Sequence, residues 1–550
     1  MWRGQRLLLV TGMCLTGCAG VREQFASLRP HPKPVAADSV TSAPDESPTE
    51  AESPAVLDEI LPVEFEEEPD TTGTDDSDRA DSEAGDPVPV AGAPATANIE
   101  NPPPSTLQLD AVVSSVYANF PLLEAARFQR NVANGEVLTA NGNFDTKLKA
   151  STENGPVGFY QTYRQTVGVT QPLYGGAEVF GGYRVGRGSF QPWYQERQTN
   201  GNGEFKGGVQ VPLARNRAID ERRAQLWKAN YARQRTEPEI QGQLIEFVRD
   251  GSLFYWDWVA AGQKQRVADR LLSLAVNRNE GIRLRVKAGD LDPPDADDNQ
   301  RIIVSREAKV IDAARKSRQT AVKLSLFYRD DVGHPVIPPA EWTPDFPEPT
   351  EIEADESPED ISLALSRRPE ILAIDILRRE IDIDYASAQN DYRPQVDALV
   401  IGSQDSGTPT SIRKDKSPFE LEAGIYAEVP IQRRKARGKI SSIEAKVSQV
   451  LAKRRMIEDK VITEIQTAHA AFHAAWLRVG KARESVRLAR YMAEVEQKKF
   501  DAGSSDLLSV NLREQQSAEA AEAEVDALLD YFQSRAIYRA AMAEDNDFGF

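Results

Sequence analysis

The feature that most constrains the fold is a long stretch that no proline interrupts. Between Arg434 and Phe500 there is no proline, and the only glycines are Gly438 and Gly480. Over this stretch apolar residues recur at spacings of three and four, which predicts one amphipathic helix. At 1.5 Å per residue such a helix would be roughly 100 Å long, more than any globular core could enclose. Its narrow apolar stripe can be buried only against similar helices lying alongside.

The long helix is predicted to be one arm of a hairpin. An Ala/Glu-rich helix over residues 505–542 follows a glycine turn and would return antiparallel to it. The first half of the chain predicts a similar hairpin over residues 219–326, which turns near residues 289–298. Pro238 lies within the first arm, where it should cap or kink the helix.

Residues 106–550 contain an internal duplication. Each half reads as a helix, strands, a very long helix, a glycine turn and a second long helix. Three landmarks recur in the same order, which makes coincidence a poor explanation. The matched segments are residues 119–125 with 367–373, 209–215 with 427–433, and 285–290 with 499–504.

The predicted strands have one apolar and one charged face. Residues 418–430 alternate with period two, and residues 204–213 do the same. Such a strand fits a half-solvated sheet, or a barrel with lipid outside and water inside. Tyr160–Pro172 and Glu178–Arg187 also read as strands, so residues 155–208 predict an extra hairpin, either an extracellular loop or additional wall.

Four to six strands of membrane length cannot close a barrel alone. The smallest membrane barrels have eight strands. An open strand edge is not tolerated in lipid, because each unpaired backbone group there costs several kcal/mol. We therefore expect closure by self-association, with the long helices continuing the wall below the sheet.

The N-terminus reads as a bacterial export signal. Two arginines precede the short apolar stretch 7–17, which ends in Leu-Thr-Gly before Cys18. This pattern predicts lipidation at Cys18; the alternative is an ordinary cleaved signal with a chance cysteine. The following segment holds 14 prolines and 20 acidic against 4 basic residues within 19–105, which predicts a disordered tether or an acidic partner-binding region. This local acidity argues against nucleic acid as a partner.

These landmarks together resemble the TolC-like outer membrane efflux protein family, in its lipoprotein branch. The resemblance covers residues 106–550 and rests on three repeated features. These are the helix openings at Pro121 and Pro369, the strand-to-helix signals at 211–213 and 429–431, and the hairpin tips at Ala288-Gly289 and Ala502-Gly503. It implies an α+β membrane protein, in which a homotrimer forms a 12-stranded outer-membrane β-barrel and a coiled-coil periplasmic tunnel. Each chain would give about four strands to the barrel, or more if the extra hairpin joins the wall.

The resemblance also implies a function and partners. The chain would be the passive exit duct of a tripartite efflux or type I secretion system, joined by a periplasmic adaptor to an inner-membrane transporter. The expected adaptor-docking residues lie at the two hairpin tips: Arg285, Ala288, Gly289, Asp290, Lys499, Ala502, Gly503 and Ser504. Acidic residues there would focus cations at the tunnel aperture, or form a solvated turn: Asp290, Asp292, Asp295, Asp297, Asp298 and Asp506.

We expect five segments along the chain. They are a signal peptide (1–17), a lipidated cysteine with an acidic tether (18–105), a first repeat (106–335), a linker (336–360) and a second repeat (361–550).

No catalytic or cofactor motif stands out. There is no phosphate-binding loop and no nucleophile elbow. His469 and His473 have the i, i+4 spacing of metal ligands, but ordinary helix-face positions fit them better. We therefore expect no enzyme activity, cofactor or metal. The rival to a channel is a lipid-anchored coiled-coil scaffold of the cell envelope that transports nothing.

Overall fold

The computed structural model describes residues 106–190, 198–351, 358–410 and 419–544. The predicted signal peptide, Cys18 and the acidic tether lie outside this part of the chain. The described residues all belong to one compact unit, Thr96–Phe550, to which both repeats contribute.

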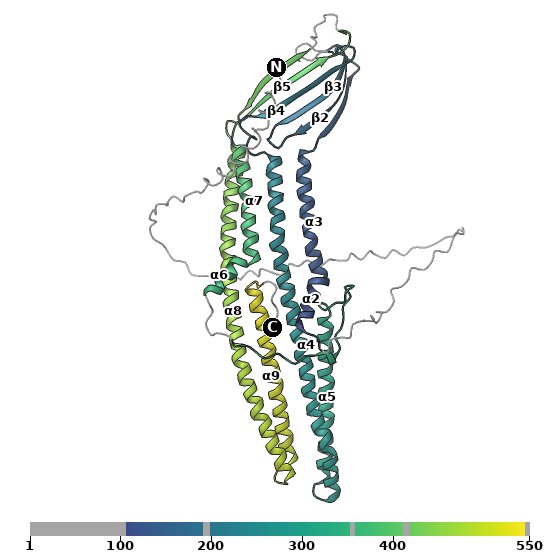
Figure 1. The fold of residues 1–550 in the computed structure, drawn as a ribbon, viewed down its shortest axis with the longest axis vertical. Helices are drawn as coiled ribbons and strands as arrows, with labels where there is room; N and C mark the ends of the chain where they lie inside the picture. The colour runs from purple at the N-terminus through teal and green to yellow at the C-terminus, as the bar shows by residue number, and fades with distance from the viewer. Residues whose placement is uncertain (1–105, 191–197, 352–357, 411–418, 545–550) are drawn as a thin grey trace, which may run out of the picture. The chain divides into compact units, whose positions relative to one another are not determined.

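Two very long helices run through this unit (Figure 1). They are α4 (Glu221–Ala288) and α8 (Arg434–Asp501), and each has 68 residues. The prediction for the second repeat is thus confirmed to within one residue at each end. Helix α4 neither begins nor ends at Pro238, which is buried inside it.

Each long helix forms the predicted hairpin with a shorter one. Helix α4 packs against α5 (Pro293–Leu324), and α8 packs against α9 (Leu507–Ala541). The other helices are α2 (Leu109–Asn119), α3 (Pro121–Asn141), α6 (Pro358–Arg367), α7 (Pro369–Asp391), and the 3₁₀ turns η1 (Gly142–Phe144) and η3 (Ala340–Trp342).

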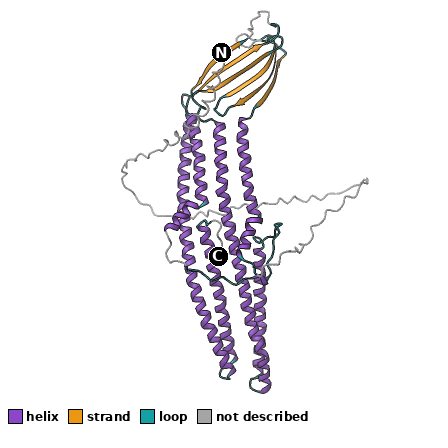
Figure 2. Ribbon diagram, viewed as in Figure 1, coloured by secondary structure: helices purple, strands orange, loops and turns teal. Residues whose placement is uncertain are grey.

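The principal helices form a single layer rather than a bundle around a common axis. Nearest the sheet, the extensive contacts place the helices in the order α3, α4, α7, α8, which can be followed from the labels of Figure 1 and the same view in Figure 2. Farther from the sheet the order is α5, α4, α9, α8. Helices α3 and α5 therefore occupy one edge of the layer, and α8 occupies the other.

The strands form one antiparallel sheet of six in sequence order, open at β1 and β6. Its strands are β1 (Lys147–Gly155), β2 (Thr162–Pro172), β3 (Glu178–Gly188), β4 (Glu204–Pro212), β5 (Gln395–Asp405) and β6 (Glu420–Glu428). Six strands are the upper end of the four to six that the alternation predicts, and two more than the four per chain that the resemblance implies. The extra hairpin, β2–β3, is sheet wall and not a loop, because it pairs with β1 on one side and β4 on the other.

The largest buried cluster lies where α2, α4, α9 and the inter-repeat linker meet. Trp258, Tyr255, Tyr531 and Phe532 are almost fully buried there. The Trp256 ring stacks on Phe532 at 4.3 Å between centroids. A single layer can bury such large side chains only where short elements cover it, so the linker completes the core.

Candidate functional site

The register of the six strands creates one continuous apolar face. Residues opposite one another in neighbouring strands share a face, so the alternation of each strand aligns across the sheet. Only one charged side chain, Arg187 at the end of β3, lies on this face within the strands. Ten large apolar side chains there are 38–74 % exposed: Leu148, Tyr163, Val167, Val169, Val179, Phe205, Val211, Val400, Leu421 and Ile425.

The opposite face is charged. Its strand residues include eight acidic and five basic side chains, so it is suited to contact with water. Arg184 and Glu204 stand opposite one another, and the Arg184 Nε donates to Glu204 Oε2 at 2.9 Å. The large apolar exceptions on this face are Phe180, Leu399, Ile401 and Tyr426.

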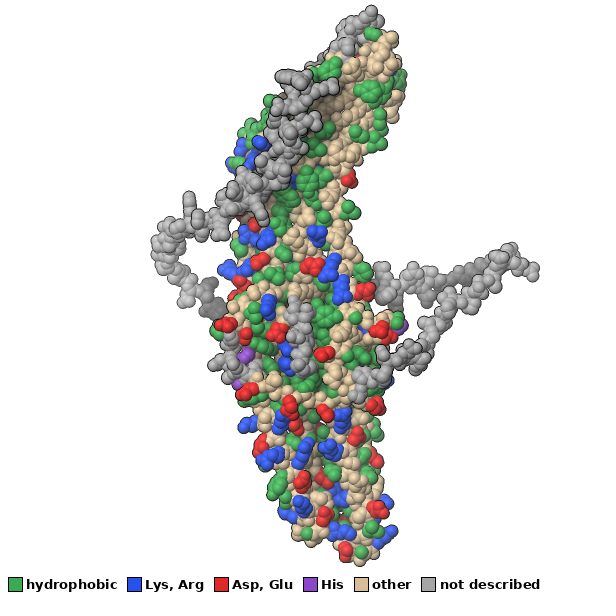
Figure 3. All heavy atoms as spheres, viewed as in Figure 1, with side chains coloured by type: hydrophobic (Ala, Val, Ile, Leu, Met, Phe, Trp, Pro, Cys, Tyr) green, Lys and Arg blue, Asp and Glu red, His purple; other side chains and the backbone are tan. Residues whose placement is uncertain are grey.

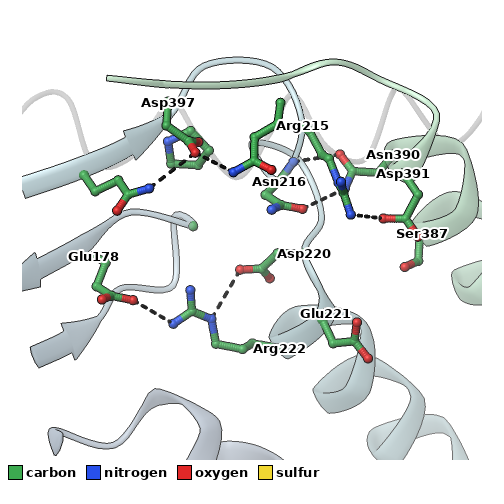
Figure 4. Close-up of a pocket in the computed structure, with 14 residues that line it drawn as sticks. Glu178, Arg215, Asn216, Asp220, Glu221, Arg222, Ser387, Asn390, Asp391 and Asp397 are labelled. Carbon is green, nitrogen blue, oxygen red and sulfur yellow. Dashed lines mark hydrogen bonds and ion pairs between the residues drawn. The ribbon is translucent and has the colours of Figure 1, made fainter. Parts of the chain in front are cut away.

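A polar joint connects the sheet to the helices (Figure 4). Asn216 adopts a left-handed conformation with φ of 67° between β4 and α4. Its backbone N–H donates to Asn390 Oδ1 at 2.9 Å, and the Asn390 amide donates back to Asn216 Oδ1 at 3.0 Å. These side-chain bonds tie the first repeat to the end of α7 in the second repeat.

Ion pairs reinforce the same joint. Arg215 pairs with Asp391 at 2.9 Å, and Arg222 lies between Glu178 and Asp220 (Figure 4). The direction of the strands is thereby fixed relative to the helices that follow them.

The two hairpin tips have the same backbone geometry. Gly289 has φ of 84° and Gly503 has φ of 75°, the left-handed region that glycine adopts without strain. The Asp290 N–H donates to Arg285 O at 2.9 Å, and the Ser504 N–H donates to Lys499 O at 2.9 Å. These are the matched positions of the two repeats.

The tips also pack against each other. Ile282 of the first repeat contacts Phe500, Leu507 and Val510 of the second in one buried cluster. The Arg285 guanidinium lies 5.1 Å from the centre of the Phe500 ring. Beside this cluster, α4 and α8 border a groove lined by Leu274, Gly281, Arg285, Ala493, Lys498 and Phe500.

Several of the tip carboxylates accept hydrogen bonds or form ion pairs at the N-terminal ends of α5 and α9. Asp295 accepts from the Asp292 backbone N–H in the capping box of α5, and Asp298 pairs with Arg301 at 2.9 Å. Asp506 is the N-cap of α9 and accepts from the Ser509 N–H at 2.7 Å. That hydrogen bond lowers the pKa of Asp506. Cation focusing by these residues stays a prediction.

One charged cluster near the tips was not predicted. Arg306 and Glu514 are buried, the Arg278 side chain is 8 % exposed, and the three residues join α4, α5 and α9. Glu514 accepts from both guanidinium groups, at 2.7 Å and 2.9 Å, while Arg278 also donates to Asn511. Burial lowers the pKa of Arg306, against the hydrogen bond and charge of Glu514. In sequence these residues look like any others on a polar helix face.

The two spaced histidines have aromatic neighbours. His469 is buried beside Tyr538, and the ring of His473 lies 6.2 Å from that of Trp476. Within the described ranges no group of three or more His, Cys, Asp or Glu side chains could hold a metal ion. None of the helices described combines the length and low charge that a membrane-spanning helix requires.

Comparison with known proteins identifies the fold. No family model matches the chain, and no curated protein matches its sequence. Solved structures do match. CusC, studied for transmembrane channel formation, has a TM-score of 0.59 and 12 % identity over 79 % of this chain and 92 % of that one. The outer membrane protein VceC of Vibrio cholerae has a TM-score of 0.56 and 16 % identity. The match covers 79 % of this chain and 96 % of VceC.

A third similar structure is the CmeC outer membrane channel of Campylobacter jejuni. Its TM-score is 0.54, with 12 % identity over 84 % of this chain and 94 % of that one. The match therefore spans both repeats and nearly the whole of each relative. The chain has the fold of the outer membrane factor channels, which confirms the TolC-like resemblance of its sequence at the level of the fold.

Proposed function

We propose that this chain is the subunit of an outer-membrane exit duct. The observation that carries the proposal is the two-faced open sheet. An exposed apolar face with a charged face behind it fits a wall between lipid and water. In the space-filling view, charged side chains are spread along the helices and are sparse on the visible part of the sheet (Figure 3).

Self-association would complete this wall, as a homotrimer in the arrangement that the resemblance implies. Strands β1 and β6 leave two edges that lipid does not tolerate. The helical layer also has two edges, and both expose apolar side chains. On α3 and α5 these include Phe128, Val132 and Ile311; on α8 they include Leu451 and Met456. Neighbouring copies would cover both edges together.

The ends of the duct have separate roles in the proposal. Lipid on Cys18 would anchor the chain in the outer membrane. The hairpin tips would bind a periplasmic adaptor that connects to an inner-membrane transporter. The charged face and the tip carboxylates would line a passive, water-filled path for efflux or secretion. The matching geometry of the two tips, at Gly289 and Gly503, supports a repeated docking surface.

Conductance in planar lipid bilayers tests the proposal. Purified full-length protein should insert and give discrete conductance steps, and it should run as a trimer that dissociates on heating. The rival scaffold would do neither, because its strands would form a soluble cap. A folded, lipid-associated protein that never conducts ions would therefore overturn the channel and favour the scaffold.

A further inference from the structure

The first repeat contributes two more strands than the second. Strands β1 and β4 correspond to β5 and β6, since each pair lies between a short helix and a long one. The hairpin β2–β3 is inserted between β1 and β4 without changing the direction of either. Because six is an even number, the edge strands β1 and β6 run in opposite directions.

The two edge strands, β1 and β6, have the same length, present apolar side chains on the same face of the sheet, and carry complementary charges on the other face. Both edge strands have nine residues. Leu148 in β1 and Leu421 in β6 lie on the same apolar face. On the charged face, β1 carries Lys147 and Lys149, while β6 carries Glu428 at the end nearest the helices. Strand β1 of one copy can therefore add antiparallel to β6 of another and keep both faces continuous.

Charge selects one register for this seam. Placing Lys149 opposite Glu428 also places Glu153 opposite Gly424, so no like charges meet. If β1 were shifted along β6 by two residues, Lys147 would lie opposite Glu428, and Glu153 would lie opposite Glu422, a like-charged pair. A shift of β1 by one residue would place its charged side chains on the apolar face of the neighbouring sheet.

The width of the sheet also matches the helical layer. At a spacing of about 4.8 Å and a tilt near 40°, six strands span an arc of about 38 Å. Four helices side by side, about 8–10 Å apart, span about 32–40 Å. Four strands would span only about 25 Å.

We propose that β1 and β6 of adjacent copies pair with Lys149 opposite Glu428, so that each copy adds six strands to the barrel. This rests on the proposed function. Three copies then close an 18-stranded barrel with a backbone radius of about 18 Å, against about 12 Å for twelve strands. The inserted hairpin thus widens the membrane segment, and it suits the duct to bulky solutes.

Disulfide trapping tests the seam. Opposing residues in antiparallel strands have Cα atoms about 4.5–5.5 Å apart, within disulfide range. The full-length double variant Lys149→Cys/Glu428→Cys, oxidised in membranes, should give covalent dimers and trimers on denaturing gels. Either single variant should stay monomeric, which also controls for the native cysteines. Leu148→Cys/Glu428→Cys should not crosslink, because these side chains lie on opposite faces.

Conductance separates this inference from the proposed function. A double variant that conducts but forms no crosslink would overturn the seam and leave the duct intact. Cross-sections of the assembly by electron cryomicroscopy should show eighteen strands. A conducting assembly with twelve, in which β2–β3 is excluded from the wall, would also overturn the inference. Absence of both conductance and crosslinks would refute the seam together with the duct.

Discussion

Replacing Glu514 by glutamine should loosen the tip region from within. Among the residues that the structure describes, Glu514 is the carboxylate that pairs with both Arg278 and Arg306, and it links helices of both repeats. The variant leaves Arg278 and Arg306 without a counter-charge in a buried site. Breaking a buried ion pair costs about 3–5 kcal/mol. The amide oxygen of glutamine can still accept one hydrogen bond, so we expect about 3 kcal/mol, the lower end of that range.

Hydrogen exchange measures this loss directly. Local opening of α5 and α9 near the cluster should become roughly a hundredfold more frequent, since 1.4 kcal/mol is a factor of ten. Mass spectrometry of peptides around Arg306 and Glu514 would report it. Glu519→Gln is the matched control, because this residue lies on the same helix but is exposed. Exchange that rises less than about threefold in Glu514→Gln would refute the claim that this cluster holds the hairpins together.

The two faces of the sheet, the hairpin tips and the half-buried Glu380 can each be tested by a matched pair of variants or a single substitution. Val400→Lys should cost about 2–4 kcal/mol and reduce the folded protein recovered in outer membranes, because Val400 is on the apolar face. Leu399→Lys, one residue away on the charged face, should be tolerated; equal recovery of the two would contradict the two-faced sheet. Gly503→Ala should strain the left-handed tip by about 1–2 kcal/mol and reduce export, measured as substrate retained in cells, with insertion unchanged. Gly480→Ala, inside α8, is the control and should leave export normal. Normal export in the Gly503→Ala variant as well would show that the tip conformation is not needed for export. Burial raises the pKa of Glu380, so folding binds a proton there and stability falls as pH rises from its ordinary value through the raised one. Glu380→Gln should therefore melt at the same or a higher temperature than the parent at pH 7; a lower melting temperature would show that its charge stabilises α7.

The long helices and their turns could be predicted because their signals are local. An unbroken apolar period gave the bounds of α8 to within a residue at each end, 434–500 against Arg434–Asp501. Glycine at the matched tips predicted turns, and both glycines lie in turns and have positive φ. The repeated landmarks then predicted which helices pair.

The sequence does not decide between loop and wall for the extra hairpin, because strand pairing is not local. Alternation identified Tyr160–Pro172 and Glu178–Arg187 as strands, but a hairpin outside the sheet alternates in the same way. Only its pairing with β1 and β4 shows that it is wall. The turn at Asn216 was also missed, since a left-handed asparagine leaves no period in the sequence.

The charged cluster was missed for a related reason. Arg278 and Glu514 are 236 positions apart, so no spacing on one helix connects them. Arginine and glutamate on a long helix usually face solvent. Their burial depends on which helix edges meet, and that is decided by the packing of four helices in one layer.

The size and shape of the solubilised particle test the central claim most directly. Full-length protein extracted in mild detergent should have, by light scattering corrected for detergent, three times the mass of one chain. Its end views by electron microscopy should show a ring with a solvent-filled centre. A particle with the mass of one chain and no central opening would contradict the account.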